Sequence, residues 1–230
     1  MNDITAKENG KKALTIVTAL TLFVAGFELF IAFTNYKPGM NFLDLTSYVL
    51  SNKYIYFMLL TVANLALLPA AVTLYKENGI SIKDEIIDKK SLGKDILIAA
   101  VAVLASEAVQ LLFSFTFKFR TGMAFKIESS LPADMIVLWI ISLVFVSGII
   151  KEIFYRGFAK RFLGPVIGEM PALLLFNVMF TVLDWHNYGL SFFLGLACIW
   201  AYKKTGRLLA PMLVHGMANL IALIYWIVVG

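Results

Sequence analysis

The sequence predicts an all-α fold, a polytopic transmembrane helical bundle of about seven spans, with six to eight compatible with the pattern. Of the 230 residues, 60% are hydrophobic and only 15% are charged, and the mean hydropathy is +0.82. A soluble domain carries about 45 to 50% apolar and about 25% charged residues. The polar residues that remain are too few to build a hydrated surface. We therefore expect a single transmembrane domain over residues 13–229, preceded by a cytoplasmic N-terminus at residues 1–12.

Apolar windows of about 20 residues, the length that crosses a bilayer as a helix, locate the spans. The candidates are residues 13–33, 54–75, 96–117, 135–158, 172–185, 191–202 and 208–229. The fifth and sixth are short. The first is too long for a signal-peptide core of roughly 7 to 15 residues, so we expect it to be retained. Four isoleucines, at positions 80, 82, 86 and 87, stand among charged residues over 80–90, which favours an interfacial amphipathic helix.

The distribution of Lys and Arg predicts the orientation. With the N-terminus in the cytoplasm and seven spans, fifteen of the twenty Lys and Arg residues fall on the inner side, as the positive-inside rule requires. We expect an integral protein of a bacterial cell membrane. Because the net charge of +5 is spread over short loops, a nucleic-acid-binding function is excluded.

A metal site is not expected. The chain has one cysteine, Cys198, and two histidines, which are too few for a closed structural zinc site. The two histidines also belong to different predicted helices. We predict no metal and no cofactor.

Ionisable residues inside a span cost about 2.5 to 3.5 kcal/mol on insertion scales and mark functional sites. Most of them lie in the second half of this chain. A helix through the fourth span places Glu152 and Arg156 on one face, with Lys151 displaced by about 100°. In the last span, the same spacing of four puts His215 and Asn219 on one face. These side chains are candidates for one buried polar site.

Two further candidates stand near the end of the fifth span. At 1.5 Å per residue, Asp184 reaches a depth at which it can meet Glu152 and His215. His186 follows two residues later, and on a helix it would point about 200° away from Asp184. We expect His186 to join the site only if the helix ends near Trp185.

At these residues the sequence resembles the CPBP family of intramembrane glutamic proteases, which includes the type II CAAX prenyl endopeptidases, the Abi proteins and bacteriocin self-immunity proteins. The family pattern is Glu-Glu-x-x-x-Arg, then Phe-x-x-x-His, then His-x-x-x-Asn, each on a different helix. Here the three segments read KEIFYRG (151–157), FTVLD (180–184) and HGMAN (215–219). The resemblance covers roughly residues 135–225, the expected protease-like core.

The resemblance implies roles for the matched positions, and two positions depart from the pattern. In the family, the first Glu and the His of the second segment activate water, and the final His and Asn stabilise the oxyanion. Lys151 stands in place of that Glu, and Asp184 stands in place of that His. A lysine ammonium is a donor without an acceptor, so it cannot take a proton from water. Lys151 and Asp184 are instead complementary, which allows a buried ion pair between them, and Glu28 and Glu107 are further candidate partners for Lys151.

Three functions remain open at this point. The first is a catalytically impaired homologue, a pseudoprotease, that binds a hydrophobic peptide or another membrane protein as a regulatory partner or in bacteriocin immunity. The second is an active intramembrane endopeptidase that cuts prenylated or hydrophobic peptides with Glu152 as the general base, within a site that includes His215, Asn219 and a shifted His186. The third is a small transporter with a proton relay through Glu28, Glu107 and Asp184.

Overall fold

The structure is a computed structural model that describes residues 3–34, 36–39, 53–88, 90–117 and 132–229. These residues form helices, turns and short connections, and no strand occurs among them. The predicted all-α fold is therefore confirmed. In chain order the helices are α1 (Asp3–Thr34), α3 (Lys53–Glu77), α4 (Ile82–Ile86), α5 (Leu92–Phe117), α6 (Ala133–Trp139), η1 (Ile140–Ser147), α7 (Gly148–Glu152), η2 (Ile153–Gly157), η3 (Ala159–Leu163), α8 (Gly164–Ile167), α9 (Glu169–Leu183), η4 (Trp185–Asn187), α10 (Ser191–Thr205) and α11 (Leu209–Val229).

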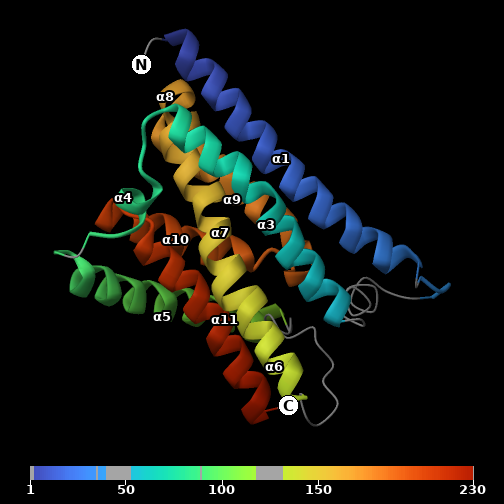
Figure 1. Ribbon diagram of the computed structural model, residues 1–230. Helices are drawn as coiled ribbons and strands as arrows, with labels where there is room; N and C mark the ends of the chain where they lie inside the picture. Colours follow the sequence, from blue (N-terminus) through green and yellow to red (C-terminus); the bar gives the residue numbers. More distant parts are fainter. Residues whose placement is uncertain (1–2, 35, 40–52, 89, 118–131, 230) are drawn as a thin grey trace.

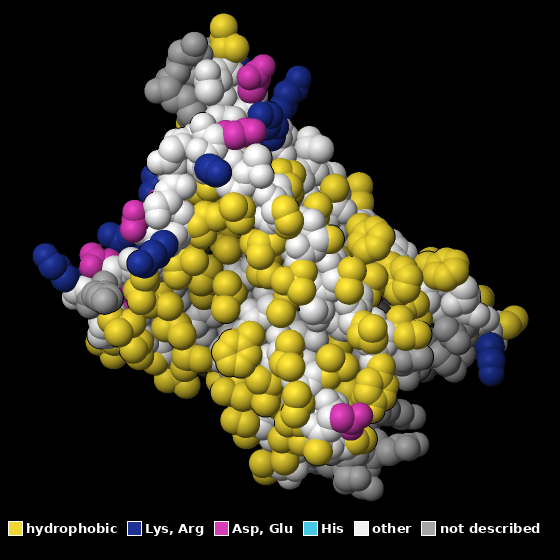
Figure 2. Space-filling model, viewed as in Figure 1, with side chains coloured by type: hydrophobic (Ala, Val, Ile, Leu, Met, Phe, Trp, Pro, Cys, Tyr) yellow, Lys and Arg dark blue, Asp and Glu magenta, His cyan; other side chains and the backbone are white. Residues whose placement is uncertain are grey.

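The chain is an integral membrane protein. Four helical stretches in the described residues are long and apolar enough to cross a membrane: 4–34, 54–77, 92–113 and 133–167. Large apolar side chains such as Phe23, Leu104 and Phe115 are more than half exposed. Figure 2 shows that such side chains cover most of the visible face, while charged side chains gather mainly at one end. An apolar exterior of this kind is stable in lipid and not in water.

The spans predicted at residues 172–185 and 191–202 correspond to α9 and α10, which are shorter than a full crossing. Each has 15 residues and is roughly 22 Å long at 1.5 Å per residue, against about 30 Å of hydrocarbon. A turn over 184–190 separates them. α9 packs against α1 and α10, and α5 lies across α10 and α11 (Figure 1).

The fourth predicted span is one continuous helical stretch from Ala133 to Ile167, and it is not a regular α-helix. Three parts of it, η1, η2 and η3, are π-helical. A π-helical turn holds more residues than an α-turn, so it rotates the side chains that follow, and such turns are frequent at functional sites. Here the π-helical turns lie on both sides of Lys151 and Glu152.

Small residues bring α7 and α11 into close contact. A Cβ atom added to Gly148 would lie 3.2 Å from the Cα atom of Gly216, and one added to Gly216 would lie 3.2 Å from the carbonyl oxygen of Val144. Small residues at a crossing let two helix backbones approach in a membrane. This crossing is next to His215 and therefore fixes how deeply that side chain enters the bundle.

The amphipathic helix expected over 80–90 is observed as the five-residue α4. Ile80, Ile82 and Ile86 pack against the core, and Ser81 caps the helix by accepting a hydrogen bond from the backbone N–H of Asp84. α4 lies against the junction of α10 and α11, where the Leu208 N–H donates to the Glu85 carbonyl at 2.7 Å. Residues 81–88, called the strap below, thus tie the first half of the chain to the second.

We predict that Gly148→Leu lowers the free energy of unfolding by about 1–3 kcal/mol, because a larger side chain cannot enter the crossing without moving a backbone. The matched control is Gly26→Leu in α1, where a Cβ atom would meet nothing within 4 Å. That change should be neutral or stabilising, since leucine favours a helix more than glycine does. Thermal unfolding in detergent measures both variants. Equal losses would show that the close crossing is not required.

Candidate active site

Arg156 lies at the centre of a buried polar network. Its Nη1 donates to Glu152 Oε1 at 3.0 Å, and its Nη2 donates to Asn177 Oδ1 at 3.2 Å and to the Gly195 carbonyl at 3.1 Å. The guanidinium carbon also lies 4.7 Å from the centroid of the Phe180 ring. With 1% of its surface exposed, a guanidinium must find all of its partners within the protein. Arg156 thereby joins η2 to α7, α9 and α10.

Glu152 extends this network to α11. Its carboxylate is fully buried, and the Oε1 atom that accepts from Arg156 also lies 2.8 Å from His215 Nδ1. The other oxygen, Oε2, has no hydrogen-bond partner among the described residues. The Glu152 and His215 side chains therefore face one another, as the predicted polar site requires.

Lys151 belongs to a second, separate pair. Its Nζ atom donates to Asp184 Oδ1 at 3.1 Å, and the two side chains are 3% and 18% exposed. The ion pair that the sequence allows is thus present. It connects α7 to the residue that follows α9. Lys151 and Glu152 are adjacent in the helix, so they point to different sides of it. Lys151 pairs with Asp184, whereas Glu152 contacts Arg156 and His215.

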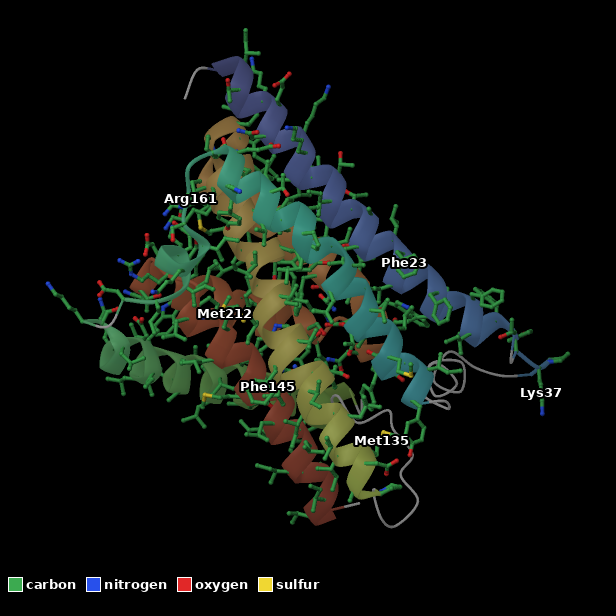
Figure 3. The ribbon with its side chains drawn as sticks, viewed as in Figure 1. Phe23, Lys37, Met135, Phe145, Arg161 and Met212 are labelled. Carbon is green, nitrogen blue, oxygen red and sulfur yellow. The ribbon has the colours of Figure 1, made fainter. Side chains whose placement is uncertain are left out.

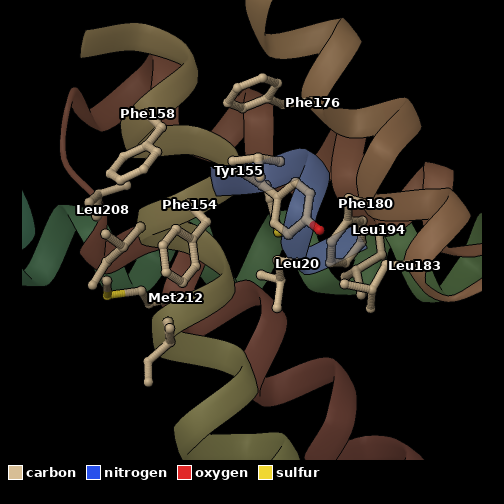
Figure 4. Packing of buried hydrophobic residues seen from close by; sticks show 14 of the residues in the cluster. Leu20, Phe154, Tyr155, Phe158, Phe176, Phe180, Leu183, Leu194, Leu208 and Met212 are labelled. Atoms are coloured by element: carbon tan, nitrogen blue, oxygen red, sulfur yellow. The ribbon is translucent and has the colours of Figure 1, made fainter. Parts of the chain in front are cut away.

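The Phe180 ring separates the two pairs. It meets the His215 ring edge to face at a centroid distance of 5.4 Å and an interplanar angle of 85°. Lys151 Nζ lies 5.5 Å from the centroid of the Phe180 ring, and Arg156 lies over the same ring. Phe180 is fully buried (Figure 4). The quadrupole of the ring attracts the Lys151 and Arg156 cations. Phe180 thereby links α9 to α7, η2 and α11.

Asn219 does not reach this network through any hydrogen bond that we observe. Its side-chain Nδ2 donates to the Leu143 carbonyl at 2.9 Å, and its backbone carbonyl accepts from Trp139 Nε1 at 3.2 Å. Leu143 lies in the π-helical η1, where the backbone pattern is altered. Asn219 therefore links α11 to the fourth span in this structure, and its role at an oxyanion stays a prediction.

The helix before Asp184 ends near Trp185, which is the condition for His186 to join the site. α9 stops at Leu183, and residues 185–187 form the short 3₁₀ helix η4. The 200° separation of residues 184 and 186 on a regular helix consequently does not apply. The side chain of His186 lies outside the described residues, so its part in the site stays a prediction.

Two residues of the network were not assigned from the sequence. Asn177 accepts from Arg156 and donates through Nδ2 to the Phe192 carbonyl of α10 at 3.1 Å. Gly195 leaves the space for this contact, since a Cβ atom there would lie 1.6 Å from Asn177 Oδ1. An asparagine in an apolar span was a visible signal for Asn177. Nothing in the sequence distinguishes Gly195 from other helical glycines.

The remaining acidic residues of the spans lie elsewhere. Glu28 is fully buried in α1 and interacts electrostatically with Tyr56 of α3. Glu107 is half-buried in α5, and its Oε1 accepts from Gln110 Nε2 at 3.5 Å. α1 packs on α3, α9 and η3, whereas α5 packs on α10 and α11. The proton relay stays a prediction.

The described residues do not gather into a ligand set for a metal. No three His, Cys, Asp or Glu side chains among them come together. Glu152 and His215 supply two donors, whereas a catalytic zinc takes three protein ligands. Cys198 is buried and donates to the Pro211 carbonyl at 3.7 Å.

These features define an integral membrane protein whose second half encloses a buried Glu–Arg–His network beside a Lys–Asp pair. Residues 132–221 match the family model described as type II CAAX prenyl endopeptidase Rce1-like. This part of the chain is therefore similar to the type II CAAX prenyl endopeptidases. No curated protein and no solved structure matches the chain.

We predict strong coupling between Lys151 and Asp184 in a double-mutant cycle. Lys151→Met or Asp184→Asn alone leaves one charge of a largely buried pair without its partner, which costs about 3–5 kcal/mol in fully buried pairs and less here because Asp184 retains some exposure. The double variant should lose less than the sum by about 1–3 kcal/mol. Thermal unfolding of the four proteins measures this. Additive losses would mean that the two groups do not interact.

Proposed function

We propose that this protein binds a hydrophobic peptide or another membrane protein and hydrolyses peptide bonds poorly or not at all. It would act as a regulatory partner or in bacteriocin self-immunity, in a bacterial cell membrane. The observation that carries this proposal is the ion pair between Lys151 Nζ and Asp184 Oδ1 at 3.1 Å. It occupies the two motif positions to which the family pattern assigns the activation of water.

The chemistry of this pair opposes hydrolysis. Activation of water needs a group that accepts a proton within hydrogen-bond reach of the water. Lys151 offers donors only, and its ammonium is 3% exposed and directed at Asp184. The Asp184 carboxylate is an acceptor, but it is held by that ammonium. Neither residue is left to perform the role that a Glu and a His share in the family pattern.

Retention of the rest of the network supports a binding function. Glu152, Arg156 and His215 keep their motif positions and contact one another. Buried polar groups of this kind are costly in a membrane, so their retention calls for a role in shape or recognition. A partner that reaches them must come through lipid-facing helices, which favours a hydrophobic peptide or a transmembrane segment.

The proposed orientation places the N-terminus in the cytoplasm. Ion pairs bring basic segments from different parts of the chain to one end of the bundle. Lys12 of α1 lies 3.3 Å from Glu77 at the end of α3, and Arg207 lies 3.4 Å from Asp88 of the strap. Arg161 pairs with Glu85 at the same strap. A basic end is the cytoplasmic end by the positive-inside rule.

An active endopeptidase is the second candidate, and one contact favours it. Glu152 Oε1 lies 2.8 Å from His215 Nδ1, and Oε2 has no hydrogen-bond partner in the described ranges. That oxygen is in position to hold a water if the site opens. Against this, Oε1 already accepts from Arg156, and the carboxylate is fully buried.

Peptide cleavage by purified protein in liposomes separates the two candidates. A prenylated peptide and a hydrophobic peptide library would be offered to the wild type, Lys151→Glu, Asp184→His and the double variant. We expect no cleavage by the wild type and measurable cleavage only by the double variant. Each single variant restores one of the two water-activating groups and still lacks the other. General acid–base groups contribute about 10²–10⁴-fold, which sets the size of the gain.

The wild type and Glu152→Ala, measured side by side, decide the alternative. If the wild type cleaves and Glu152→Ala abolishes cleavage at unchanged stability, the chain is an endopeptidase and the binding proposal is wrong. Asn219→Ala serves as a further comparison. Asn219→Ala should lower the stability, because it removes the hydrogen bond to Leu143. Like the wild type, this variant should show no cleavage.

A further inference from the structure

We propose that the chain has a second ligand site, for a phosphate-bearing anion, built from Arg161, Tyr75 and Tyr202 under the strap. The site is separate from the Glu152 network and does not depend on the proposed function. Figure 3 places Arg161 beside α4, at the end of the bundle where the basic segments meet. Tyr75 comes from α3 and Tyr202 from α10.

The residues of this cluster come from four elements and interact with one another. Tyr75 interacts electrostatically with Tyr202, and both phenols interact with Glu85 and Arg161. Tyr202 also interacts with Glu169 at the start of α9. Lys160 Nζ lies 4.7 Å from the centroid of the Tyr202 ring. Two cations, two carboxylates and two phenols thus lie close together at this end of the bundle.

The phenols are hydrogen-bond donors without acceptors. The hydroxyl oxygens of Tyr75 and Tyr202 have no hydrogen-bond partner in the described part of the chain, although the side chains are only 0% and 1% exposed. A buried tyrosine hydroxyl normally has a partner. The Tyr75 hydroxyl is held against the backbone at Gly157, where a Cβ atom would lie 2.3 Å from it. Buried donors beside a guanidinium are suited to a ligand with several acceptor oxygens.

Glu85 of the strap occupies part of this site. Its Oε1 accepts from Arg161 Nη2, while its Oε2 is buried and has no hydrogen-bond partner in the described residues. The carboxylate thus leaves its own second oxygen and both phenols unsatisfied. A phosphate group carries more oxygens in a tetrahedral arrangement, and a guanidinium binds it in the same way as a carboxylate. Glu85 therefore stands where the ligand would bind.

The site has a route of entry. The Arg161 side chain is 40% exposed, so it reaches the surface while the phenols do not. The contacts of the strap that carries Glu85 include the Leu208–Glu85 backbone hydrogen bond, the Arg207–Asp88 pair and the packing of Ile82 and Ile86 on the core. Movement of Glu85 away from Arg161 would open the phenols to a ligand from the membrane surface.

Two sources supply this chemistry: the headgroup of an anionic lipid and free phosphate. The test uses the full chain in a non-ionic detergent and follows the thermal unfolding midpoint. Short-chain phosphatidylglycerol, short-chain phosphatidylcholine and inorganic phosphate are titrated separately. A ligand that binds the folded state raises the midpoint by an amount that gives its Kd. A response to phosphatidylglycerol alone identifies a lipid site, and a response to inorganic phosphate identifies a site for the free anion.

Two kinds of variant should change the Kd of the phosphate-bearing ligand in opposite directions. Glu85→Gln should lower the Kd severalfold, because it removes the competing charge. Arg161→Gln should raise the Kd at least about tenfold, and Tyr202→Phe should raise it less while leaving the fold intact. Lys203→Gln, on the exposed end of α10, should have no effect.

Three outcomes would overturn the proposal. The first is that neither phosphatidylglycerol nor phosphate raises the midpoint of the wild type or of Glu85→Gln. The second is that Lys203→Gln weakens the response as much as Arg161→Gln does, which would indicate general surface charge. The third is an equal response to phosphatidylcholine, which would indicate a preference for lipid without recognition of the anion.

Discussion

The structure around the site depends on one buried guanidinium. Arg156 donates hydrogen bonds to groups on three other elements: Glu152 on α7, Asn177 on α9 and the Gly195 carbonyl on α10. In a membrane, an unpaired group of this kind is far more costly than in a solvated protein. The helices must consequently meet at the distances that these contacts set. Through Glu152 the same constraint reaches His215 on α11.

The adjacent residues Lys151 and Glu152 have different partners as a result of this constraint. Because Glu152 is committed to Arg156 and His215, Lys151 is left to face Asp184 on another side of the helix. Phe180 lies between the two pairs and contacts members of both. Glu152, Arg156 and His215 thus form one buried network that connects the helices. Lys151 and Asp184 form a second pair beside it.

The sequence predicted the membrane-embedded helical fold and one buried polar site for Glu152, Arg156 and His215, because apolar runs locate spans and a spacing of four places side chains on one helix face. Charged residues inside spans must find partners, which made Asp184 a candidate partner for Lys151. The π-helical turns around Lys151 were not predicted, since an apolar run locates a span without specifying its backbone hydrogen-bond pattern. Gly195 was missed because its role is to leave space for Asn177. Asn219 was placed at the site by its spacing, yet its contact is with Leu143.

The most direct test of this account is the unfolding free energy of Arg156→Lys compared with that of Arg161→Lys. Lysine keeps the charge but cannot reach several acceptors at once, so Arg156→Lys leaves buried groups unsatisfied and should cost about 2–4 kcal/mol. Arg161 lies in the same helical stretch, is 40% exposed, and should lose less than about 1 kcal/mol. A stability for Arg156→Lys equal to that of the wild type would contradict the claim that this guanidinium organises the bundle.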